Sequence, residues 1–394
     1  MTSEWRTIRA ADFIDFNPRL SLKKGDIATK VAMDKLKPFT KKIPETEKAE
    51  FNGGAKFCNG DTVMARITPC LENGKTAYVD MLDDGEIGFG STEFIVMRAK
   101  TGISDPQFVY YTAINPVFRN VAIKSMVGSS GRQRVQQSVL EELELSVPDL
   151  DEQRRIGDFL ARIDEKIALN DRINDNLEQQ AQSYSQELFV DNADPEWAIG
   201  TISDLGTIVG GSTPSKAKPE YYTESGIAWI TPKDLSNNKS KFVSHGENDI
   251  TELGLRNSSA SIMPEGTVLF SSRAPIGYIA IAAGEVTTNQ GFKSVVPKPE
   301  IGTPFVYFFL KNTLPVIEGM ASGSTFKEVS GSTMKNVSAV IPDAETLAKF
   351  SDFCAPIFAQ QRILEEQNQS LATLRDNLLP KLMSGEIDVS AVQL

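Results

Sequence analysis

Two short segments combine residue types that could bind a methyl donor or a nucleotide. Residues 115–118 read Asn-Pro-Val-Phe, close to the Asn/Asp-Pro-Pro-aromatic motif of an amino-methyltransferase, but the second proline is missing and the segment lies in an expected helix. Gly74-Lys75-Thr76 matches the end of a phosphate-binding Walker loop, but Pro69 stands where the first glycine is required. A turn between strands is the better interpretation, so the sequence shows no site for a methyl donor or for ATP.

The side chains that usually perform hydrolysis or bind metal ions are too sparse for a conventional site. The single histidine, His245, cannot supply an ordinary catalytic triad or a histidine-rich metal site. Cys58, Cys70 and Cys354 lie far apart without Cys-x-x-Cys spacing, which argues against zinc and disulfides. Acidic residues occur all along the chain, so spacing selects no nuclease cluster. We expect a non-catalytic chain with no catalytic residue, metal site or cofactor of its own.

Length and composition indicate a protein of two or more domains. The chain has 394 residues, more than a single hydrophobic core usually holds, and its 40% hydrophobic and 24% charged residues are ordinary for a soluble protein. No run approaches 18 consecutive apolar residues, and Met1–Ala10 carries charges where a signal peptide would need an apolar segment. These features predict a cytoplasmic protein without a membrane partner.

The net charge of -11 by itself argues against a nucleic-acid-binding protein, but the charge is unevenly distributed along the chain. Residues 1–147 hold 20 basic and 19 acidic side chains, and residues 193–340 hold 12 and 14. The excess lies instead in residues 148–192, with 5 basic and 11 acidic side chains, and in residues 341–394, with 4 and 8. The two larger regions are therefore free to present local basic faces.

An internal duplication organises the chain. Glu4-Trp5 recurs as Glu196-Trp197, and from Met126 onward the shift between the copies settles at 194 residues. The other matched pairs are Asp12-Phe13 with Asp204-Leu205, residues 60–66 with 265–271, residues 108–111 with 305–308, and Val147-Pro148 with Ile341-Pro342. Trp5 and Trp197 recur at the same place and are predicted to be core anchors. Each copy reads as a mixed domain followed by a helix.

Both expected helices carry an apolar heptad seam, which is typical of a coiled coil. The predicted seam residues are Ile156, Leu160, Ile163, Ile167, Asn174, Leu177, Leu188, Ile357, Leu364, Asn368, Leu371, Leu378 and Leu382. Pro148 and Asp149, like Pro342 and Asp343, suit a helix start. A helix of about 39 residues makes a rod of roughly 58 Å, long enough to act as a spacer.

A pseudo-twofold arrangement with antiparallel helices and facing seams is the compact solution for two tandem copies. Asn174 and Asn368 occupy equivalent seam positions, where a polar side chain can fix the register, although exposure of both to solvent is an equal alternative. We predict a mixed α/β fold with two tandem domains separated by two long coiled-coil-like helices. The predicted boundaries are 1–147, 148–192 (central helix), 193–341 and 342–394 (C-terminal helix and tail).

Within the domains, short β-like runs alternate with helical stretches, which is the pattern of a mixed α/β domain. The runs are Thr62–Ile67, Phe94–Met97, Thr267–Phe270 and Tyr278–Ala282, and the helical stretches are Pro106–Val121 and Pro304–Met320.

The order of several sequence blocks resembles the DNA-specificity subunits of type I restriction-modification enzymes. In the second copy the blocks are GSTPS at 211–215, WITPKDL at 229–235, GTVLFSSRAPIG at 266–277, TTNQGF at 287–292, SGSTFKEVS at 322–330 and IPDAE at 341–345. In the first copy they are residues 67–70 with 72–76 and VPDLDEQRRIGDFLARID at 147–164. One departure is that Ala344-Glu345-Thr346 replaces the Asp151-Glu152-Gln153 run, which puts the second helix's entry contacts in doubt.

This resemblance implies that each domain is a target-recognition domain for one half of a bipartite, asymmetric double-stranded DNA sequence. Two readers on one face of DNA should be centred roughly 34 Å apart, a span that two overlapping rods can provide. The implied partners are two methyltransferase subunits, docked on the acidic helix faces, and restriction/translocase subunits in the full assembly. S-adenosylmethionine and ATP with Mg²⁺ are then expected on those partners.

The resemblance also directs attention to cationic, amide and hydroxyl side chains in its loop-like blocks, because these groups contact phosphates and base edges. The predicted DNA-binding residues are Arg66, Lys75, Arg132, Gln133, Arg134, Ser212, Thr213, Lys216, Lys233, Arg273, Asn289, Gln290 and Lys327. Each has a structural alternative: residues 289–291 suit a turn, Lys216 suits a solvated surface, and Thr213-Pro214 suits a strand cap.

Two other classes of function remain open. The acidic balance suits a non-catalytic protein-protein scaffold with duplicated α/β domains. A self-sufficient methyltransferase or nuclease is disfavoured by its missing motifs. Salt-dependent, sequence-selective duplex binding would separate a DNA reader from a scaffold.

Overall fold

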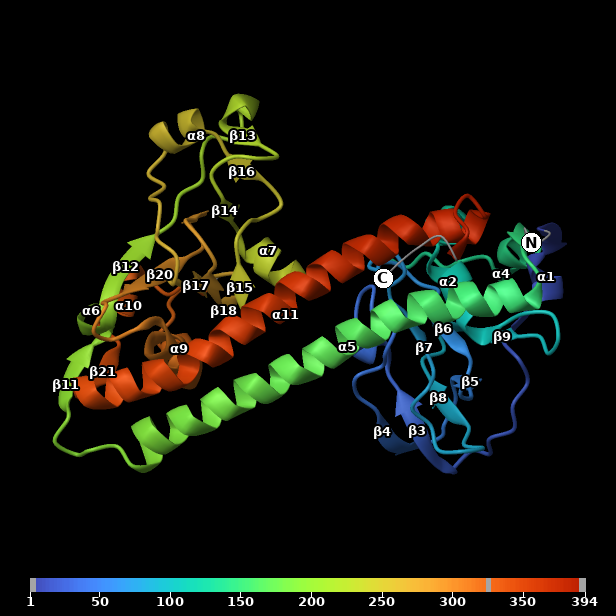
Figure 1. The fold of residues 1–394 in the computed structure, drawn as a ribbon, viewed down its shortest axis with the longest axis horizontal. Coiled ribbons are helices and arrows are strands. Elements are labelled where there is room, and N and C mark those ends of the chain that lie inside the picture. The colour runs from blue at the N-terminus through green and yellow to red at the C-terminus, as the bar shows by residue number, and fades with distance from the viewer. Residues whose placement is uncertain (1–4, 324–326, 390–394) are drawn as a thin grey trace. The chain divides into compact units, whose positions relative to one another are not determined.

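The computed structural model describes residues 5–323 and 327–389. They form two compact units (Figure 1): unit 1 takes Met1–Leu169 with Asn368–Leu394, and unit 2 takes Asn170–Gln367. The boundaries between the units fall inside the two long helices, so each unit combines one mixed domain with a part of each helix. In the parts of the chain that the structure describes, no helix has the length and apolarity needed to cross a membrane.

Among its described residues, unit 1 contains ten short strands, the start of the first long helix and the end of the second. Its strands are β1 (Arg6–Arg9), β2 (Ile14–Phe16), β3 (Ile27–Val31), β4 (Glu47–Glu50), β5 (Ala55–Phe57), β6 (Thr62–Ala65), β7 (Thr76–Tyr78), β8 (Gly88–Gly90), β9 (Phe94–Ala99) and β10 (Glu144–Val147) among the described residues. Its helices are α1 (Ala10–Phe13), a 3-10 turn at Met33–Lys35, α2 (Pro106–Ile114), α3 (Pro116–Lys124), α4 (Gln137–Glu141), the first part of α5 (Leu150–Gln186) and the last part of α11 (Ala344–Ser384).

Unit 2 repeats this plan after a π-helical turn at Glu187–Asp191. Its strands are β11 (Ala198–Thr201), β12 (Gly206–Gly210), β13 (Tyr222–Thr223), β14 (Trp229–Ile230), β15 (Phe242–Val243), β16 (Asp249–Ile250), β17 (Val268–Ser272), β18 (Ile276–Ala282), β19 (Thr287–Thr288), β20 (Lys293–Pro297) and β21 (Ser338–Ile341). Its helices are the last part of α5, α6 (Ile202–Leu205), a 3-10 turn at Pro219–Tyr221, α7 (Pro232–Asn237), α8 (Glu252–Arg256), α9 (Thr303–Gly319), α10 (Gly331–Lys335) and the first part of α11.

The main sheet has the same strand order in both units. It runs β2-β9-β6-β7 in unit 1 and β12-β20-β17-β18-β15 in unit 2. The antiparallel pairs β1-β10 and β11-β21 also correspond, and each is followed by a long helix. Unit 1 adds a second sheet, β4-β3-β8-β5, whereas unit 2 has the small pairs β13-β16 and β14-β19. The predicted duplication and the mixed α/β fold class are confirmed.

The predicted strands appear as β6, β9, β17 and β18, and the predicted helix Pro304–Met320 appears as α9. The region Pro106–Val121, where a helical stretch is expected, is helical, and the chain divides it into α2 and α3. Asn115 leaves the helical conformation with φ -56° and ψ 130°, and its side chain accepts a hydrogen bond from the Val117 N–H. Pro116 then opens α3 without needing an N–H donor. The Asn-Pro-Val-Phe segment is therefore a helix boundary.

Both long helices start on an aspartate. The Asp149 carboxylate accepts a hydrogen bond from the Glu152 N–H at 2.9 Å, and the Asp343 carboxylate accepts one from the Thr346 N–H at 2.9 Å. These bonds satisfy backbone donors that the first turn of a helix leaves free. The hydrogen bonds from the backbone and hydroxyl of Thr346 also lower the pKa of Asp343, because they favour its ionised form. The predicted helix starts are confirmed.

The entries of the two helices differ at the position where the sequence blocks diverge. Gln153 is fully buried, donates to the carbonyls of Ile103 and Pro148, and accepts from the Asp105 N–H. Its counterpart one repeat later, Leu347, packs into the apolar core of unit 2. One copy therefore secures its helix through a buried amide, and the other through apolar packing.

Within each unit, α5 and α11 run antiparallel with the predicted seam residues between them. In unit 1, Asp164 pairs with Arg375, and the Asn368 side chain lies 3.5 Å from the Ile167 carbonyl oxygen. In unit 2, Gln361 donates to the Asn174 carbonyl at 3.2 Å, and the rings of Tyr184 and Phe350 are in contact.

Every apolar side chain predicted for the seam is buried or partly buried. The side-chain oxygen of Asn174 is buried as well, and the Asn368 amide turns toward α5. Exposure of both asparagines to solvent is therefore the wrong alternative.

The predicted tryptophan anchors are only partly buried. Trp5 packs against the core of unit 1. Trp197 lies against the Phe189 ring and donates its indole N–H to the Asp343 carboxylate at 3.0 Å. Trp197 thus ties the start of the second domain to the first turn of α11.

Candidate nucleic-acid interface

In unit 2, loops from three strand ends converge on a pocket of about 470 Å³. Thr213 and Lys216 follow β12, Arg273 follows β17, and Asn289 and Gln290 precede β20. These five residues were all predicted from the sequence blocks, and Lys233 at the start of α7 lines the same pocket. The strand ends of the main sheet and the start of α7 therefore gather six of the eight residues predicted for the second domain into one concavity.

The Asn289–Gly291 turn is held by the loops around it. The Asn289 N–H donates to the Ile230 carbonyl, and the Ser212 and Ser272 N–H groups donate to the Thr288 and Gly291 carbonyls at 2.8 and 2.7 Å. The Asn289 side-chain oxygen accepts from the Gly291 N–H at 2.8 Å. The alternative interpretation of this segment as a turn is therefore correct, and the turn places Gln290, which accepts a hydrogen bond from the Thr213 hydroxyl, at the exposed tip.

The cations of this pocket have acidic neighbours. Lys233 pairs with Glu247 at 2.6 Å, and this hydrogen bond raises the pKa of Lys233. Arg273 lies 3.4 Å from Glu328. Lys216 is exposed at the rim. Exposed pairs of this kind add little stability, so both cations can exchange their partners for phosphate oxygens at a small cost.

The two other residues predicted for the second domain lie beside the pocket. The Ser212 carbonyl accepts the indole N–H of Trp229 at 3.0 Å, which fixes the wall of the pocket. Trp229 itself is 6% exposed. Lys327 is exposed and is next in the chain to Glu328, the partner of Arg273.

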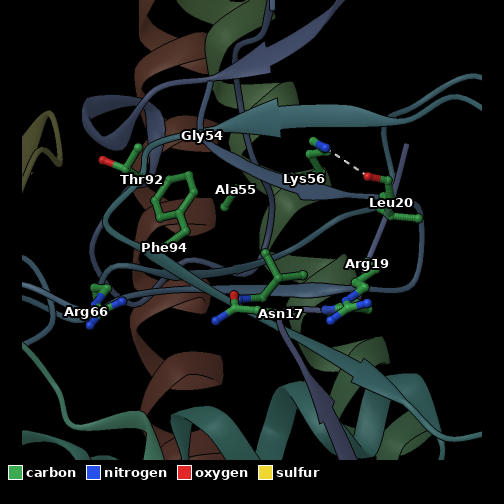
Figure 2. A pocket seen from close by; sticks show the side chains of 11 residues that line it. Asn17, Arg19, Leu20, Gly54, Ala55, Lys56, Arg66, Thr92 and Phe94 are labelled. Atoms are coloured by element: carbon green, nitrogen blue, oxygen red, sulfur yellow. Dashed lines mark hydrogen bonds between the residues drawn. The ribbon is translucent and has the colours of Figure 1, made fainter. Parts of the chain in front are cut away.

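Unit 1 has a pocket of about 550 Å³ at the corresponding strand ends, shown in Figure 2. Asn17 and Arg19 follow β2, Arg66 follows β6, and Thr92 precedes β9. Since β2, β6 and β9 correspond to β12, β17 and β20, the two pockets occupy equivalent places in the repeat. Lys56, from β5, completes the cationic lining.

The backbone of Arg66 is fixed at the end of its strand. Its N–H donates to the Glu93 carbonyl at 2.9 Å, and its carbonyl accepts from the Val135 N–H at 2.8 Å. In unit 2, the Ser272 N–H donates to the Gly291 carbonyl, and the Ser272 carbonyl accepts from the Val329 N–H. The same backbone frame therefore holds the base of both pockets.

Four other residues predicted for the first domain do not line this pocket. Lys75 donates its ammonium to the Met33 carbonyl at 2.9 Å, so it braces a turn. Arg134 binds both oxygens of Glu93, and these hydrogen bonds lower the pKa of Glu93. Arg132 is exposed on the preceding loop, and the Gln133 carbonyl accepts from the Thr68 N–H.

Sequence reasoning missed Asn17, Arg19 and Lys56. The segment after β2 holds the place in the fold that Thr213 and Lys216 hold after β12. The two segments share no sequence block, so only strand order relates them.

A buried lysine joins the first domain to α5. Lys41 is 7% exposed, donates to Gln107 and lies 3.2 Å from the Tyr111 hydroxyl. Its ammonium is 4.9–5.4 Å from the ring centroids of Tyr78, Tyr110 and Tyr111. Burial lowers the pKa of Lys41 to about 8. The Tyr111 hydroxyl in turn donates a hydrogen bond to the carboxylate of Asp164 on α5, with 2.5 Å between the two oxygens.

Lys241 has the corresponding role in the second domain. It is 7% exposed, pairs with Glu178 on α5 at 2.5 Å and donates to Gln361 on α11 at 2.8 Å. Its ammonium lies 3.8 Å from the Phe358 ring centroid and 4.5 Å from that of Tyr307. Burial lowers the pKa of Lys241, although Glu178 opposes this effect.

The matched segments 108–111 and 305–308 each supply two rings beside the buried lysine of their unit, and Tyr78 and Phe358 complete the two sets. Each recognition-like domain is thus attached to the helices of its own unit by a buried ammonium in an aromatic cage. Such a cage can hold the domain in a defined orientation on its helices.

Comparison with known proteins is consistent with this duplicated arrangement. The family model "Type I restriction modification DNA specificity domain" matches residues 3–179 and again residues 195–374. A crystal structure of a type I restriction-modification system S subunit from M. genitalium has a similar fold. Its TM-score is 0.59 at 17% identity, over 96% of both chains.

Two curated relatives carry the name of specificity subunits. The type I restriction enzyme MjaIX specificity subunit of Methanocaldococcus jannaschii is 40% identical over 180 residues, which cover 43% of this chain and 41% of that relative. The type I restriction enzyme HindI specificity subunit of Haemophilus influenzae is 25% identical over 407 residues, covering 83% of this chain and 86% of that relative. The match therefore spans less than half of the first relative and most of the second.

Proposed function

Because the chain belongs to the family of type I restriction-modification DNA specificity subunits, we propose that it is the non-catalytic DNA reader of such a complex. Each mixed domain reads one half of a bipartite, asymmetric double-stranded DNA target. The two long helices set the distance between the two readers.

The observation that carries this proposal is the pair of equivalent pockets. Both lie at the same strand ends of the duplicated sheet, and both are lined by cationic, amide and hydroxyl side chains. Such groups bind phosphates and base edges. A protein whose two copies keep a polar concavity at the same strand ends, with different side chains lining each, is suited to two similar but non-identical half-sites.

The acidity of the long helices supports a second part of the proposal. The regions 148–192 and 341–394 carry most of the excess negative charge, whereas the domains are near neutral. We propose that the exposed helix faces dock two methyltransferase subunits, and that restriction/translocase subunits join the full assembly. S-adenosylmethionine and ATP with Mg²⁺ then bind to those partners, which perform adenine methylation and DNA cleavage.

Replacing Lys233 and Arg273 together with alanine should weaken recognition of the second half-site alone. Both line the pocket of unit 2, and each lost base or phosphate contact costs on the order of tenfold in affinity. The measurement is the affinity of the assembled methyltransferase complex for duplexes carrying base changes in either half. Base changes in the first half of the target should reduce the affinity of the variant by the same factor as they reduce the affinity of the wild type.

Arg256→Ala is the matched control for this experiment. Arg256 is an exposed cation of the same unit, pairs with Glu252 and does not line the pocket. Its removal should leave both half-sites unaffected. Equal losses at both halves in the Lys233 and Arg273 variant would contradict separate readers.

The whole proposal is tested by co-expressing the chain with its methyltransferase partner in a host that lacks adenine methylation. Mapping of modified adenines should give one bipartite motif with a fixed gap. Absence of methylation, with the partner shown to be active and assembled, would favour a protein-protein scaffold.

A further inference from the structure

The pocket of unit 1 has a different charge from its counterpart in unit 2. Arg19, Lys56 and Arg66 line it, and none of the described residues in its lining is acidic. Figure 2 shows Arg66 and Arg19 on either side of Asn17, with Lys56 across the pocket from them. The pocket of unit 2 contains Asp234 and Glu247 among its lining residues. The two pockets are therefore equivalent in position but not in the ligand that they suit.

Arg66 has donor capacity that the described part of the protein does not use. Its Nε is buried and has no hydrogen-bond partner among the described residues, although the side chain as a whole is only partly buried. The nearby carboxylate of Glu93 is occupied, because Arg134 donates to both of its oxygens at 2.6–3.0 Å. A buried, unsatisfied guanidinium N–H is costly, so a small rotation of Arg66 that turns this N–H toward an acceptor in the pocket is favourable.

The amide in the pocket is not free to read a base. Asn17 accepts from the Val96 N–H at 2.9 Å through its side-chain oxygen, and it donates to Gln137 at 2.6 Å through its side-chain nitrogen. Lys56 is also engaged, since it donates to the Leu20 carbonyl at 2.9 Å. Lys56 therefore contributes positive charge, while Arg19 and Arg66 are left to donate hydrogen bonds.

From this arrangement we propose that the pocket of unit 1 seats a backbone phosphate of the DNA, with Arg66 and Arg19 as its donors. The inference rests on the proposed function, because it assigns a role to a pocket of the first reader. A phosphate diester offers only acceptor oxygens and a negative charge, which match a lining of cations without carboxylates. A phosphate contact positions the duplex and carries no base information, so this pocket sets the register of the first half-site.

Single methylphosphonate substitutions in the target duplex test this inference, because they remove the charge of one phosphate at a time. The assembled wild-type complex should lose affinity at one or two phosphates of the first half-site. Arg66→Gln should weaken binding of the unmodified duplex, lower the slope of log affinity against log salt by about 0.9, and be insensitive to methylphosphonate at those same positions. Its methylation motif should stay unchanged.

Lys233→Gln is the control, because it removes one charge from the other unit. It should leave the methylphosphonate response of the first half-site as in the wild type. A changed base preference in Arg66→Gln would overturn the inference in favour of base reading. An unchanged salt slope, or full sensitivity to methylphosphonate at every position, would also overturn it.

The result is separable from the proposed function. If the wild-type complex shows no sequence-selective binding, the proposed function itself fails. If the wild type binds selectively and Arg66→Gln behaves like the wild type, only the phosphate assignment fails. Circular dichroism and thermal unfolding of Arg66→Gln identify a loss of affinity that comes from misfolding.

Discussion

Arg375→Leu is expected to destabilise unit 1 by about 3–5 kcal/mol, because it leaves a carboxylate buried without its cation. The Arg375 and Asp164 side chains are 8% and 7% exposed, and their charged atoms are 2.6 Å apart. Burial alone would lower the pKa of Arg375, but the carboxylates of Asp164 and Asp376 reverse this effect and raise it. The pair joins α11 to α5 within unit 1, and Tyr111 donates a further hydrogen bond to Asp164.

Urea unfolding followed by hydrogen exchange of unit 1 peptides measures this effect. Arg154→Leu is the matched control, because Arg154 forms an exposed ion pair with Asp151 on α5. Its loss should cost well under about 1 kcal/mol. If the two variants had the same unfolding midpoint, the buried pair would have no special role in holding the helices.

Lys41 is expected to make the stability of unit 1 rise with pH between about 8 and 10.5. Burial lowers the pKa of this lysine in the folded protein to about 8, whereas its ordinary value is 10.5. Below pH 8 the folded and unfolded states both carry the proton, and the cost of burying the charge is fully present. Between the two values the folded state releases its proton while the unfolded state keeps it, so stability increases with pH.

The size of this rise is about 3 kcal/mol, since a tenfold change in proton affinity corresponds to about 1.36 kcal/mol. Burial raises the pKa of Tyr78 to about 12 and the pKa values of Tyr110 and Tyr111 well above their ordinary value, so these rings stay protonated in the folded protein throughout this window. In the unfolded chain they release protons near their ordinary pKa of 10, which lowers stability at the upper end of the window, so the difference between the wild type and Lys41→Met isolates the effect of the lysine. In Lys41→Met the rise should be absent. Unfolding free energies of both proteins at pH 7 to 10.5 provide the comparison, and parallel curves would refute the effect.

The duplication, the long helices and their seams follow from the sequence alone. Their signals are local or periodic: apolar residues at heptad spacing define one helix face, and Asp149 and Asp343 supply the hydrogen bonds that begin each helix. The resemblance to a known family also rests on ordered blocks that can be read along the chain. Asn115-Pro116 was an available local signal for a boundary between two helices, because Asn115 caps α3 and Pro116 opens it.

The second pocket was predictable because its residues belong to those blocks. Thr213, Lys233, Arg273 and Gln290 stand in these blocks and Lys216 directly follows one, and the fold brings the segments together. The sequence could not show which acidic side chains lie beside these cations. Only the folded chain pairs Lys233 with Glu247 and gives Arg273 a neighbouring carboxylate.

The first pocket and the buried lysines were decided by tertiary structure. Arg19 and Lys56 lie in segments that share no block with the second copy, and they meet Arg66 only through the strand order β2-β9-β6-β7 and the packing of β5 beside it. Lys41 and Lys241 stand in ordinary polar stretches, where a lysine is normally exposed. Burial beside the aromatic segments 108–111 and 305–308 makes them internal contacts, and that burial depends on how each domain packs against its helices.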